Sequence, residues 1–459
     1  MTKSVTLKNK FFELIDNKTF MTCALLTVVY LISGYWKWME IGVSIIAFVF
    51  FIINPIQQSF CVYLYLHSFT FSNICYESCL LITTVCFCLV LLGKYILGIK
   101  KNNYPIYKKL IIVMASFIII SILISLPNKL YGYSWAYLFY FPLFYFFFAM
   151  RKDFNINQAM KYMLLGVFVT YALAIIFNFM PGFQYKSTET GRRFMAFTNH
   201  PNTLYMRTLF ALTYYMYCLL NNKLSLLKFG LIYLFCSIII LSTLSKMGMA
   251  MLCLMTLIAL ILYLKQDFKK RAKYVGIFVG VILIVALICN KHILSIFERI
   301  FDGDGAFEAN IINQLTTGRD DIWKDYWVQC VKNPFTLLFG NGMLTQEVFI
   351  HAQGEIRAPH SIYVFLLYRF GIVGILVLAY IAYLFLKDLN KEKPRLIAYL
   401  PLIMFLLVGL VSNTFKSYNF IHIILSAQIL FEHCKEKTSS NINLNQPENE
   451  KKTISENSF

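Results

Sequence analysis

The chain has 459 residues, of which 58% are hydrophobic and only 14% are charged. That composition excludes an ordinary soluble domain, because apolar runs of roughly 17–25 residues, each long enough to cross a bilayer as a helix, recur along most of the chain. The net charge of +19 does not indicate a nucleic-acid partner, since the lysines and arginines cluster in short segments between apolar runs. Such clusters are typical of cytoplasmic loops, where they set orientation during insertion.

The apolar runs predict an all-α polytopic membrane protein with about fourteen transmembrane helices, about twelve at the fewest, and one long extracellular loop. The expected spans are 19–36, 40–54, 59–73, 79–98, 109–126, 134–150, 161–180, 203–220, 224–242, 247–264, 272–290, 360–386, 396–414 and 418–432. Threaded alternately from a cytoplasmic N-terminus, they place both termini and the basic clusters at 100–109, 151–152, 265–273 and 387–395 in the cytoplasm.

The expected organisation is a cytoplasmic N-terminus at 1–18, a transmembrane domain at 19–432 and a disordered cytoplasmic tail at 433–459. The long loop runs from about residue 291 to 359, and loops of this length are usually functional or disordered. Six of its apolar residues fall at helical spacing: Ile322, Trp323, Tyr326, Trp327, Cys330 and Val331. They predict an amphipathic helix that either lies on the membrane surface or caps a cavity.

A second extracellular segment, GRRFMAFTNHPN, combines two arginines with the start of a helix. Arg192 and Arg193 lie where the topology requires no positive charge, and Pro201 suits the first turn of the next span. Guanidinium groups beside the free N–H groups of a helix N-terminus predict an anion site. The alternative is an arginine pair that reaches toward lipid headgroups.

Two residues of the long loop are further candidates for chemistry. Arg319 in TTGRDDIW precedes the expected amphipathic helix and could bind an anion, or could form a local salt bridge with Asp320 and Asp321. His360 lies where the loop meets the next span. An imidazole with its ordinary pKa of about 6.5 accepts a proton at pH 7, so His360 is a candidate general base toward a hydroxyl. A helix-capping or interfacial histidine is the alternative.

Two more arginines, Arg207 and Arg369, fall within apolar spans. An arginine at mid-span costs about 2.5–3.5 kcal/mol on insertion scales, so each requires a partner or a wet cavity. Arg207 is close to its helix end and has snorkelling as an alternative.

No metal or cofactor is expected from the motifs. DGDG at 302–305 lacks the other ligands of a calcium loop. The chain has no phosphate-binding loop of the GxxxxGK type, and no carboxylate pair in it indicates a metal-dependent sugar-nucleotide site. The cysteines lie mostly inside apolar runs, where they act as small hydrophobic residues.

Taken in order, the motifs resemble the O-antigen ligase and polymerase superfamily of bacterial surface glycan enzymes. The matching groups over about residues 190–375 are Arg193 with Pro201 and Asn202; Ser245, Lys246 and Gly248; Gly318, Arg319 and Trp323; Asn333 and Pro334 with Gly340 and Gly342; and His360 with Gly371 and Gly374. The departures are Ala196 for a glycine, Lys246 for an arginine, Ser361 for the asparagine after the histidine, and Arg369 where an acidic residue is common.

The resemblance implies a GT-C-like, metal-independent, inverting glycosyltransferase without a cofactor, working at the outer face of the cytoplasmic membrane of a bacterium. It implies a polyprenyl-diphosphate-linked glycan as donor, a second glycan as acceptor, membrane lipids as surroundings, and a chain-length regulator and a flippase as candidate partners. The abundance of Lys, Asn, Ile and Phe suggests an AT-rich genome and favours a repeat-unit polymerase for capsular or exported polysaccharide. A ligase that uses another acceptor is the alternative, and a flippase for the lipid-linked glycan is the alternative from a different class.

By the same resemblance, Arg193 and Arg319 are expected to bind the diphosphate, with Arg192 in reserve, and His360 is expected to be the catalytic base. The supporting candidates are Asn202, Lys246 and Arg369.

Overall fold

The computed structural model describes residues 16–70, 78–101, 103–128, 137–181, 188–189, 193–198, 200–266, 271–272, 276, 280, 319–351, 354–387, 396–410 and 421–444. Its longer elements are α1 (Asn17–Ser33), α2 (Met39–Ile53), α3 (Ile56–Leu66), α4 (Ser78–Lys100), α5 (Lys108–Ser125), α6 (Tyr137–Ala149), α7 (Ile156–Phe177), α8 (Pro201–Leu220), α9 (Leu226–Ser242), α10 (Lys246–Gln266), α14 (Arg319–Val331), α15 (Pro334–Phe339), α16 (Ile362–Lys387), α17 (Leu400–Gly409) and α18 (Ile421–Leu444). The 3₁₀ turns η2 (Arg151–Asp153) and η4 (Leu396–Tyr399) join helices, and two antiparallel hairpins pair β1 (Thr188–Glu189) with β2 (Arg193–Phe194) and β3 (Val348–Ile350) with β4 (Glu355–Arg357).

The described helices confirm an all-α membrane protein. Five of them, α4, α5, α7, α10 and α16, are long and apolar enough to cross a membrane, and α1, α2, α6, α9, α17 and α18 include shorter apolar stretches. The expected span at 272–290 falls almost wholly outside the described residues, so the number of about fourteen helices stays a prediction.

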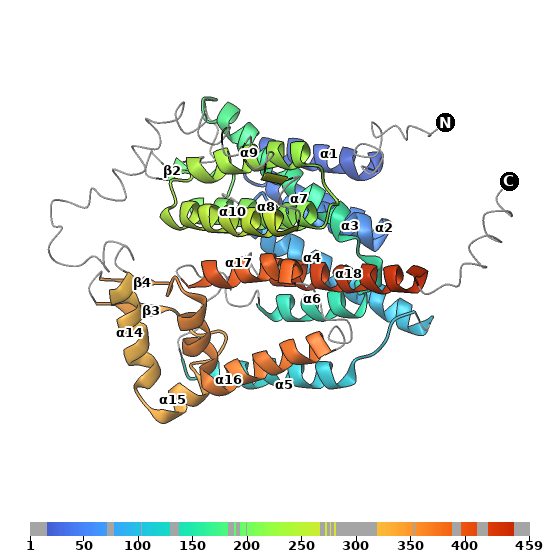
Figure 1. The fold of residues 1–459 in the computed structure, drawn as a ribbon. Helices are drawn as coiled ribbons and strands as arrows, with labels where there is room; N and C mark the ends of the chain where they lie inside the picture. The colour runs from blue at the N-terminus through green and yellow to red at the C-terminus, as the bar shows by residue number, and fades with distance from the viewer. Residues whose placement is uncertain are drawn as a thin grey trace, which may run out of the picture.

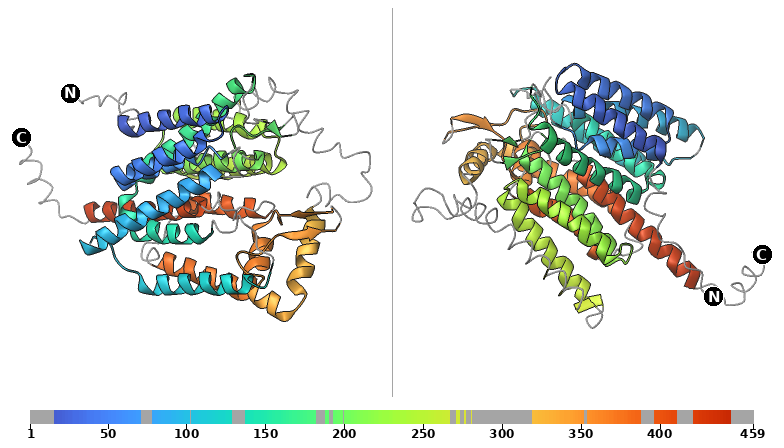
Figure 2. Two further views of the ribbon diagram at one scale, coloured as in Figure 1. Left: turned by 180° about the vertical axis from the view of Figure 1, so that it is seen from behind. Right: turned by 90° about the horizontal axis from the view of Figure 1, so that it is seen from above.

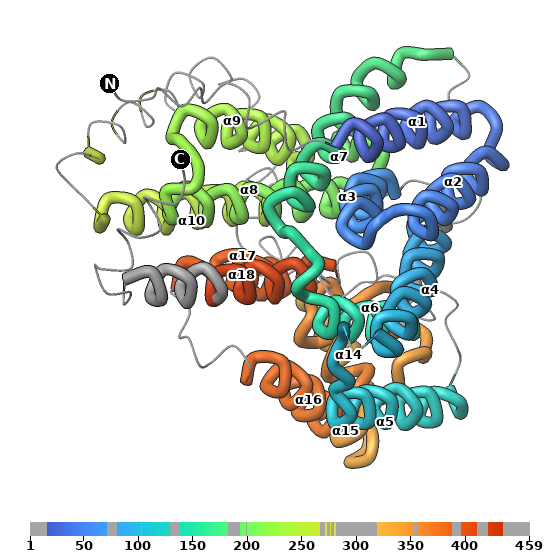
Figure 3. The backbone as a smooth tube through the Cα atoms, turned by 90° about the vertical axis from the view of Figure 1, so that its right-hand side faces the viewer, coloured from blue at the N-terminus to red at the C-terminus, as the bar shows by residue number. Residues whose placement is uncertain are grey.

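The expected span 203–220 forms α8, but this helix is not among the apolar ones. All of its residues except Asn202 are buried, because α7, α9, α10 and α17 pack around it (Figure 3). A helix enclosed by protein need not present an apolar surface to lipid, so α8 tolerates threonines, tyrosines and Arg207.

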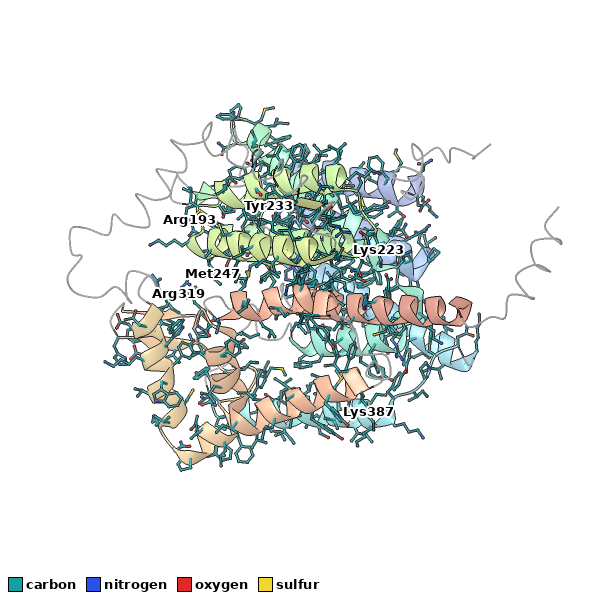
Figure 4. All side chains as sticks on the ribbon, viewed as in Figure 1. Arg193, Lys223, Tyr233, Met247, Arg319 and Lys387 are labelled. Carbon is teal, nitrogen blue, oxygen red and sulfur yellow. The ribbon has the colours of Figure 1, made fainter. Side chains whose placement is uncertain are left out.

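The bundle has two chemically different ends. Figure 4 shows Arg193 and Arg319 at one end, here called the site end, and Lys223 and Lys387 toward the other, here called the basic end. α14 lies across the site end, at a steep angle to the long helices (Figure 1 and Figure 2). This helix confirms the helical segment predicted in the long loop, with Ile322, Tyr326 and Cys330 buried and Trp327 and Val331 exposed.

α18 continues to Leu444 and so includes the first twelve residues of the segment 433–459, which the sequence predicts as a tail. His433 is 7% exposed, and its Nδ1 lies 3.2 Å from the Tyr217 hydroxyl of α8. Packing of this turn against the bundle extends the helix, and the Lys-Glu-Lys that follows consists of good helix formers. Residues 445–459 lie outside the described part of the chain.

α16 is broken at Gly371, whose φ of 61° and ψ of −173° are not helical. Because of this break, the carbonyls just before Gly371 lack the N–H donors that an uninterrupted helix would supply. N–H groups of the turn after α15 donate to these carbonyls instead. Asn341 donates its backbone N–H to the Tyr368 carbonyl at 2.9 Å, and Gly342 donates to the Arg369 carbonyl at 2.8 Å. The backbone of this turn thus completes the hydrogen bonding of a helix at membrane depth.

The same turn is fixed to α5 and to a buried cation. Met343 donates its N–H to Ser121 Oγ at 2.8 Å, and Leu344 donates to Ser125 Oγ at 2.9 Å. The Arg369 guanidinium is 2% exposed and donates to the Met343 carbonyl at 3.0 Å. Arg369 therefore has the partner that its position in an apolar span requires.

We predict that Gly371→Ala destabilises the protein. Its φ and ψ fall in a region that only glycine readily occupies, at a cost of about 1–3 kcal/mol for another residue, and an added Cβ would press against the Leu338 carbonyl. The purified variant in nanodiscs should melt several degrees lower than wild type. Gly230→Ala in α9 is the matched control, because nothing lies within 4 Å of its added methyl group; equal melting of the two variants would contradict the prediction.

Candidate active site

The first half of the candidate site lies at the start of α8. His200 caps this helix by accepting the Asn202 N–H at its Nδ1, at 3.0 Å, and Pro201 occupies the first turn. Arg193 on β2 donates from Nη2 to Asn202 Oδ1 at 3.0 Å and from Nε to the Thr243 carbonyl at 3.3 Å. The structure therefore brings Arg193 and Asn202 together at a helix N-terminus, where anions are favoured.

The turn between α9 and α10 forms the next wall. Ser245 Oγ accepts the Gly248 N–H at 3.2 Å and so caps α10, which begins at Lys246. A Cβ on Gly248 would lie 3.0 Å from the Tyr205 ring, so glycine permits the close contact between α10 and α8. This contact gives a physical reason for the Ser-Lys-x-Gly element, and it places Lys246 within three residues of the Thr243 carbonyl that holds Arg193.

Tyr205 of α8 acts electrostatically on Arg319 of α14. Burial lowers the pKa of Arg319 from its ordinary value, and the nearby Tyr205 hydroxyl acts in the opposite direction. The guanidinium at the start of α14 is thus partly desolvated. Sequence reasoning missed Tyr205 because a tyrosine in an apolar span reads as core; its position three residues after Asn202, on the same side of α8, was the available signal.

The second half of the site is organised by α14. Trp323 donates its Nε1–H to the Pro359 carbonyl at 2.7 Å, and Tyr326 donates its hydroxyl to the Arg357 carbonyl at 2.8 Å. Trp323 is one helical turn beyond Arg319 and therefore on the same side of α14. The helix that begins with Arg319 thus holds the segment that ends in His360.

His360 has a positive φ of 49°. This left-handed conformation is uncommon outside glycine, although asparagine, aspartate and histidine adopt it more often than other residues, and non-glycine residues in it cluster at functional sites. The buried Ser361 follows, and its carbonyl accepts the Phe365 N–H in the first turn of α16. His360 is thus half-buried at a helix entrance, as its position in the sequence predicted.

Ala196 also has a positive φ, 52°, and is fully buried. This conformation explains why a glycine suits the position, since glycine adopts it without a steric cost. Alanine is the smallest side chain that can replace it.

Arg207 lies deeper, beneath the segment that carries Arg193. It is 1% exposed and donates to Thr70 Oγ1 at 3.4 Å, so snorkelling is excluded. Thr70 in turn donates its N–H to the Phe197 carbonyl at 3.1 Å. Arg207 therefore supports the chain between β2 and α8.

Two buried histidines that sequence reasoning missed lie near Arg207. His422 of α18 stacks on Phe210 of α8 at 4.6 Å between ring centroids, and its ring lies 6.3 Å from that of His67. Single histidines in apolar spans read as core residues, so only their coincidence with a buried arginine would have singled them out.

The remaining candidates divide into two groups. Arg369 holds the turn after α15 at the break in α16, and its guanidinium lies 5.4 Å from the centre of the Phe365 ring. Arg192 and Gly318 lie outside the described residues. Within the described part of the chain, His, Cys, Asp and Glu side chains form no group of three or more that could hold a metal ion.

The fold and this site define a multi-pass helical membrane protein with cationic side chains gathered at one end of its bundle. Residues 231–379 match the family model described as O-antigen ligase, which confirms the resemblance to the O-antigen ligase and polymerase superfamily. Members of this family are glycosyltransferase-like enzymes, either ligases or polymerases. The matched segment includes Lys246, Arg319 and His360, whereas Arg193 and Asn202 precede it. No curated protein and no solved structure matches the chain.

We predict that Trp323→Phe lowers turnover more than donor affinity. Phenylalanine keeps an aromatic ring but cannot donate the hydrogen bond to the Pro359 carbonyl. This hydrogen bond is worth about 0.5–1.5 kcal/mol, which corresponds to a loss of up to roughly tenfold in rate if His360 shifts. The measurement is kcat and KM in a reconstituted transfer assay. Trp327→Phe on the exposed side of α14 is the control and should keep wild-type kcat; a loss of equal size in both variants would argue against positioning of His360.

Proposed function

We propose that the protein polymerises polyprenyl-diphosphate-linked oligosaccharide repeat units into a capsular or exported polysaccharide at the outer face of the bacterial cytoplasmic membrane. The observation that carries this proposal is the gathering of Arg193, Asn202, Tyr205 and Arg319 at one end of the bundle, with α14 tying Arg319 to the His360 segment. The segregation of Lys223 and Lys387 toward the other end (Figure 4) supports the orientation, with the basic end cytoplasmic.

In the proposed reaction, a hydroxyl of the acceptor sugar attacks the anomeric carbon of the donor. The new C–O bond forms as the bond to the diphosphate breaks, and the polyprenyl diphosphate leaves with the electron pair. His360 takes the proton of the attacking hydroxyl. Attack from the side opposite the leaving group inverts the anomeric centre.

The leaving diphosphate carries growing negative charge as its bond breaks. Arg193 is hydrogen-bonded to Asn202 at the start of α8, and Arg319 lies at the same end of the bundle (Figure 4). In this proposal the diphosphate binds to both guanidinium groups and to the N-terminus of α8. Partial desolvation of Arg319 strengthens such an interaction. Lys246 and Arg192 are the supporting cations in this proposal, and neither a metal nor a nucleotide takes part.

A ligase that transfers the glycan to another acceptor would use the same donor chemistry, and no described residue distinguishes the two acceptors. A flippase is less well supported, because α8 is packed along its whole length by neighbouring helices. A gel of surface glycans from a deletion strain separates the three. Single repeat units at the surface support the polymerase, free long chains a ligase, and lipid-linked units retained inside the cell a flippase.

We predict that His360→Ala leaves the protein inserted but lowers its rate by about 10²–10⁴, the usual effect of removing a general base. His360→Asn is a second variant, because asparagine tolerates positive φ but cannot take the proton. Chain length on a gel and initial rate in vesicles are the measurements. His351→Ala is the control, since His351 is the exposed histidine of the β3–β4 hairpin; wild-type chains from the His360 variants would refute the role.

We predict that Arg193→Lys weakens binding of the lipid-linked donor by roughly tenfold to a hundredfold. The reason is that a lysine ammonium cannot both keep the hydrogen bond to Asn202 and bind a phosphate with two parallel N–H groups. The measurement is the KM for the lipid-linked donor. Arg271→Lys at the basic end is the control and should keep wild-type KM. An unchanged donor KM in Arg193→Lys would exclude diphosphate binding by Arg193.

A further inference from the structure

Large apolar side chains are exposed at the corner where α14 meets α15. The six residues of this corner, here called the α14–α15 elbow, are Trp327, Val328, Val331, Phe335, Leu338 and Phe339. Trp327 is 55% exposed and Phe335 is 58% exposed. These two helices belong to the long loop and do not cross the bundle (Figure 1), so their exposure is not explained by a transmembrane span.

α14 presents three different sides. Ile322, Tyr326 and Cys330 form the buried side, which packs on β3 and α16. Asp321, Asp325 and Gln329 are each one position before a buried residue, and Trp323, Trp327 and Val331 are each one position after one. At 3.6 residues per turn, these two stripes flank the buried stripe on opposite sides, and Val328 and Lys324 lie on the side away from it. A helix with this arrangement lies at a boundary between water and lipid.

The elbow is held at the end of a lipid-facing helix. Met343 and Leu344, in the turn that follows α15, donate backbone hydrogen bonds to Ser121 and Ser125 in the last turns of α5. Leu123 and Leu126, at that end of α5, are 58% and 59% exposed. Figure 1 and Figure 3 both show α15 beside this end of α5. The apolar surface of the elbow therefore continues the apolar surface of the membrane-spanning bundle.

Basic side chains border the elbow. Lys324 and Lys332 are both exposed, and each lies within five residues of Trp327. Lysines beside an apolar interfacial surface place their ammonium groups among lipid phosphates, and tryptophan is enriched at the same level of the bilayer. This combination fits phospholipid better than it fits an apolar protein partner.

We propose that the α14–α15 elbow is seated in the boundary between headgroups and acyl chains, in the leaflet at the site end, with phospholipid as its occupant. The lipid contact does not depend on the proposed glycosyl transfer. If that function holds, the elbow also sets the depth of α14, whose first residue is Arg319, at the level where the phosphates of a lipid-linked donor lie.

The test compares two tryptophans of one helix. Full-length protein is placed in nanodiscs of phosphatidylcholine brominated on the acyl chain close to the headgroup, and emission is recorded for wild type, Trp327→Phe and Trp323→Phe. The emission assigned to Trp327 by difference should fall by about half or more with bromolipid and change little with aqueous iodide. The emission assigned to Trp323, which is bonded to the Pro359 carbonyl, should respond weakly to both.

Three outcomes would overturn the proposal. Quenching of Trp327 by iodide but not by bromolipid places the elbow in water, and quenching by neither means that protein covers it. Protection from bromolipid by added polyprenyl diphosphate assigns the surface to the donor chain instead. If Trp327→Phe does not fold, Phe335→Trp adds a reporter at the elbow, and its extra emission must be quenched by bromolipid for the proposal to stand.

Discussion

The interrupted backbone of α16 is the constraint on which the rest of the structure depends. A helix within a membrane cannot leave its backbone carbonyls without hydrogen-bond donors. The break at Gly371 deprives the Tyr368 and Arg369 carbonyls of their helical donors. The N–H groups of Asn341 and Gly342 meet this need. Because a backbone partner fixes position more strictly than an apolar contact, the end of the long loop is held in one register against the bundle.

That register determines where the functional groups lie. From the fixed turn the chain leads through the β3–β4 hairpin to His360, and α14 is tied to the same segment through Trp323 and Tyr326. Arg193 comes from a different part of the chain and is positioned by Asn202 and the Thr243 carbonyl. Tyr205 of α8 packs closely against Gly248 of α10 and acts electrostatically on Arg319. The site is therefore assembled from two parts, one supplied by the long loop and one supplied by the helical bundle.

Much of this arrangement could be read from the sequence, because the responsible signals are local. Apolar length predicted the long apolar helices α4, α5, α7, α10 and α16, and helical spacing predicted α14. Asn333 indeed caps α15, accepting the Thr336 N–H at 2.7 Å, ahead of the glycine turn that the resemblance singled out. The resemblance placed Arg193 and Asn202 in one motif, and their bond gives that motif a physical basis.

The features that sequence reasoning missed depend on contacts between distant segments. Complete burial of α8 follows from its neighbours and not from its own composition. The partner of Arg369 is a backbone carbonyl, which every residue carries, so no side-chain pattern could indicate it. His433 also depends on a distant segment, because its hydrogen bond to Tyr217 joins α18 to α8. Composition alone would end α18 earlier in the chain.

The buried guanidinium of Arg369 also has a consequence for biogenesis. Its acceptor, the Met343 carbonyl, and the α5 serines that hold the acceptor's turn all precede Arg369 in the chain. They are therefore synthesised and available before α16 leaves the ribosome. Docking of the nascent turn onto α5 would offer the arriving cation a hydrogen-bond acceptor at once, so the charged segment could enter the bilayer with a partner already in place.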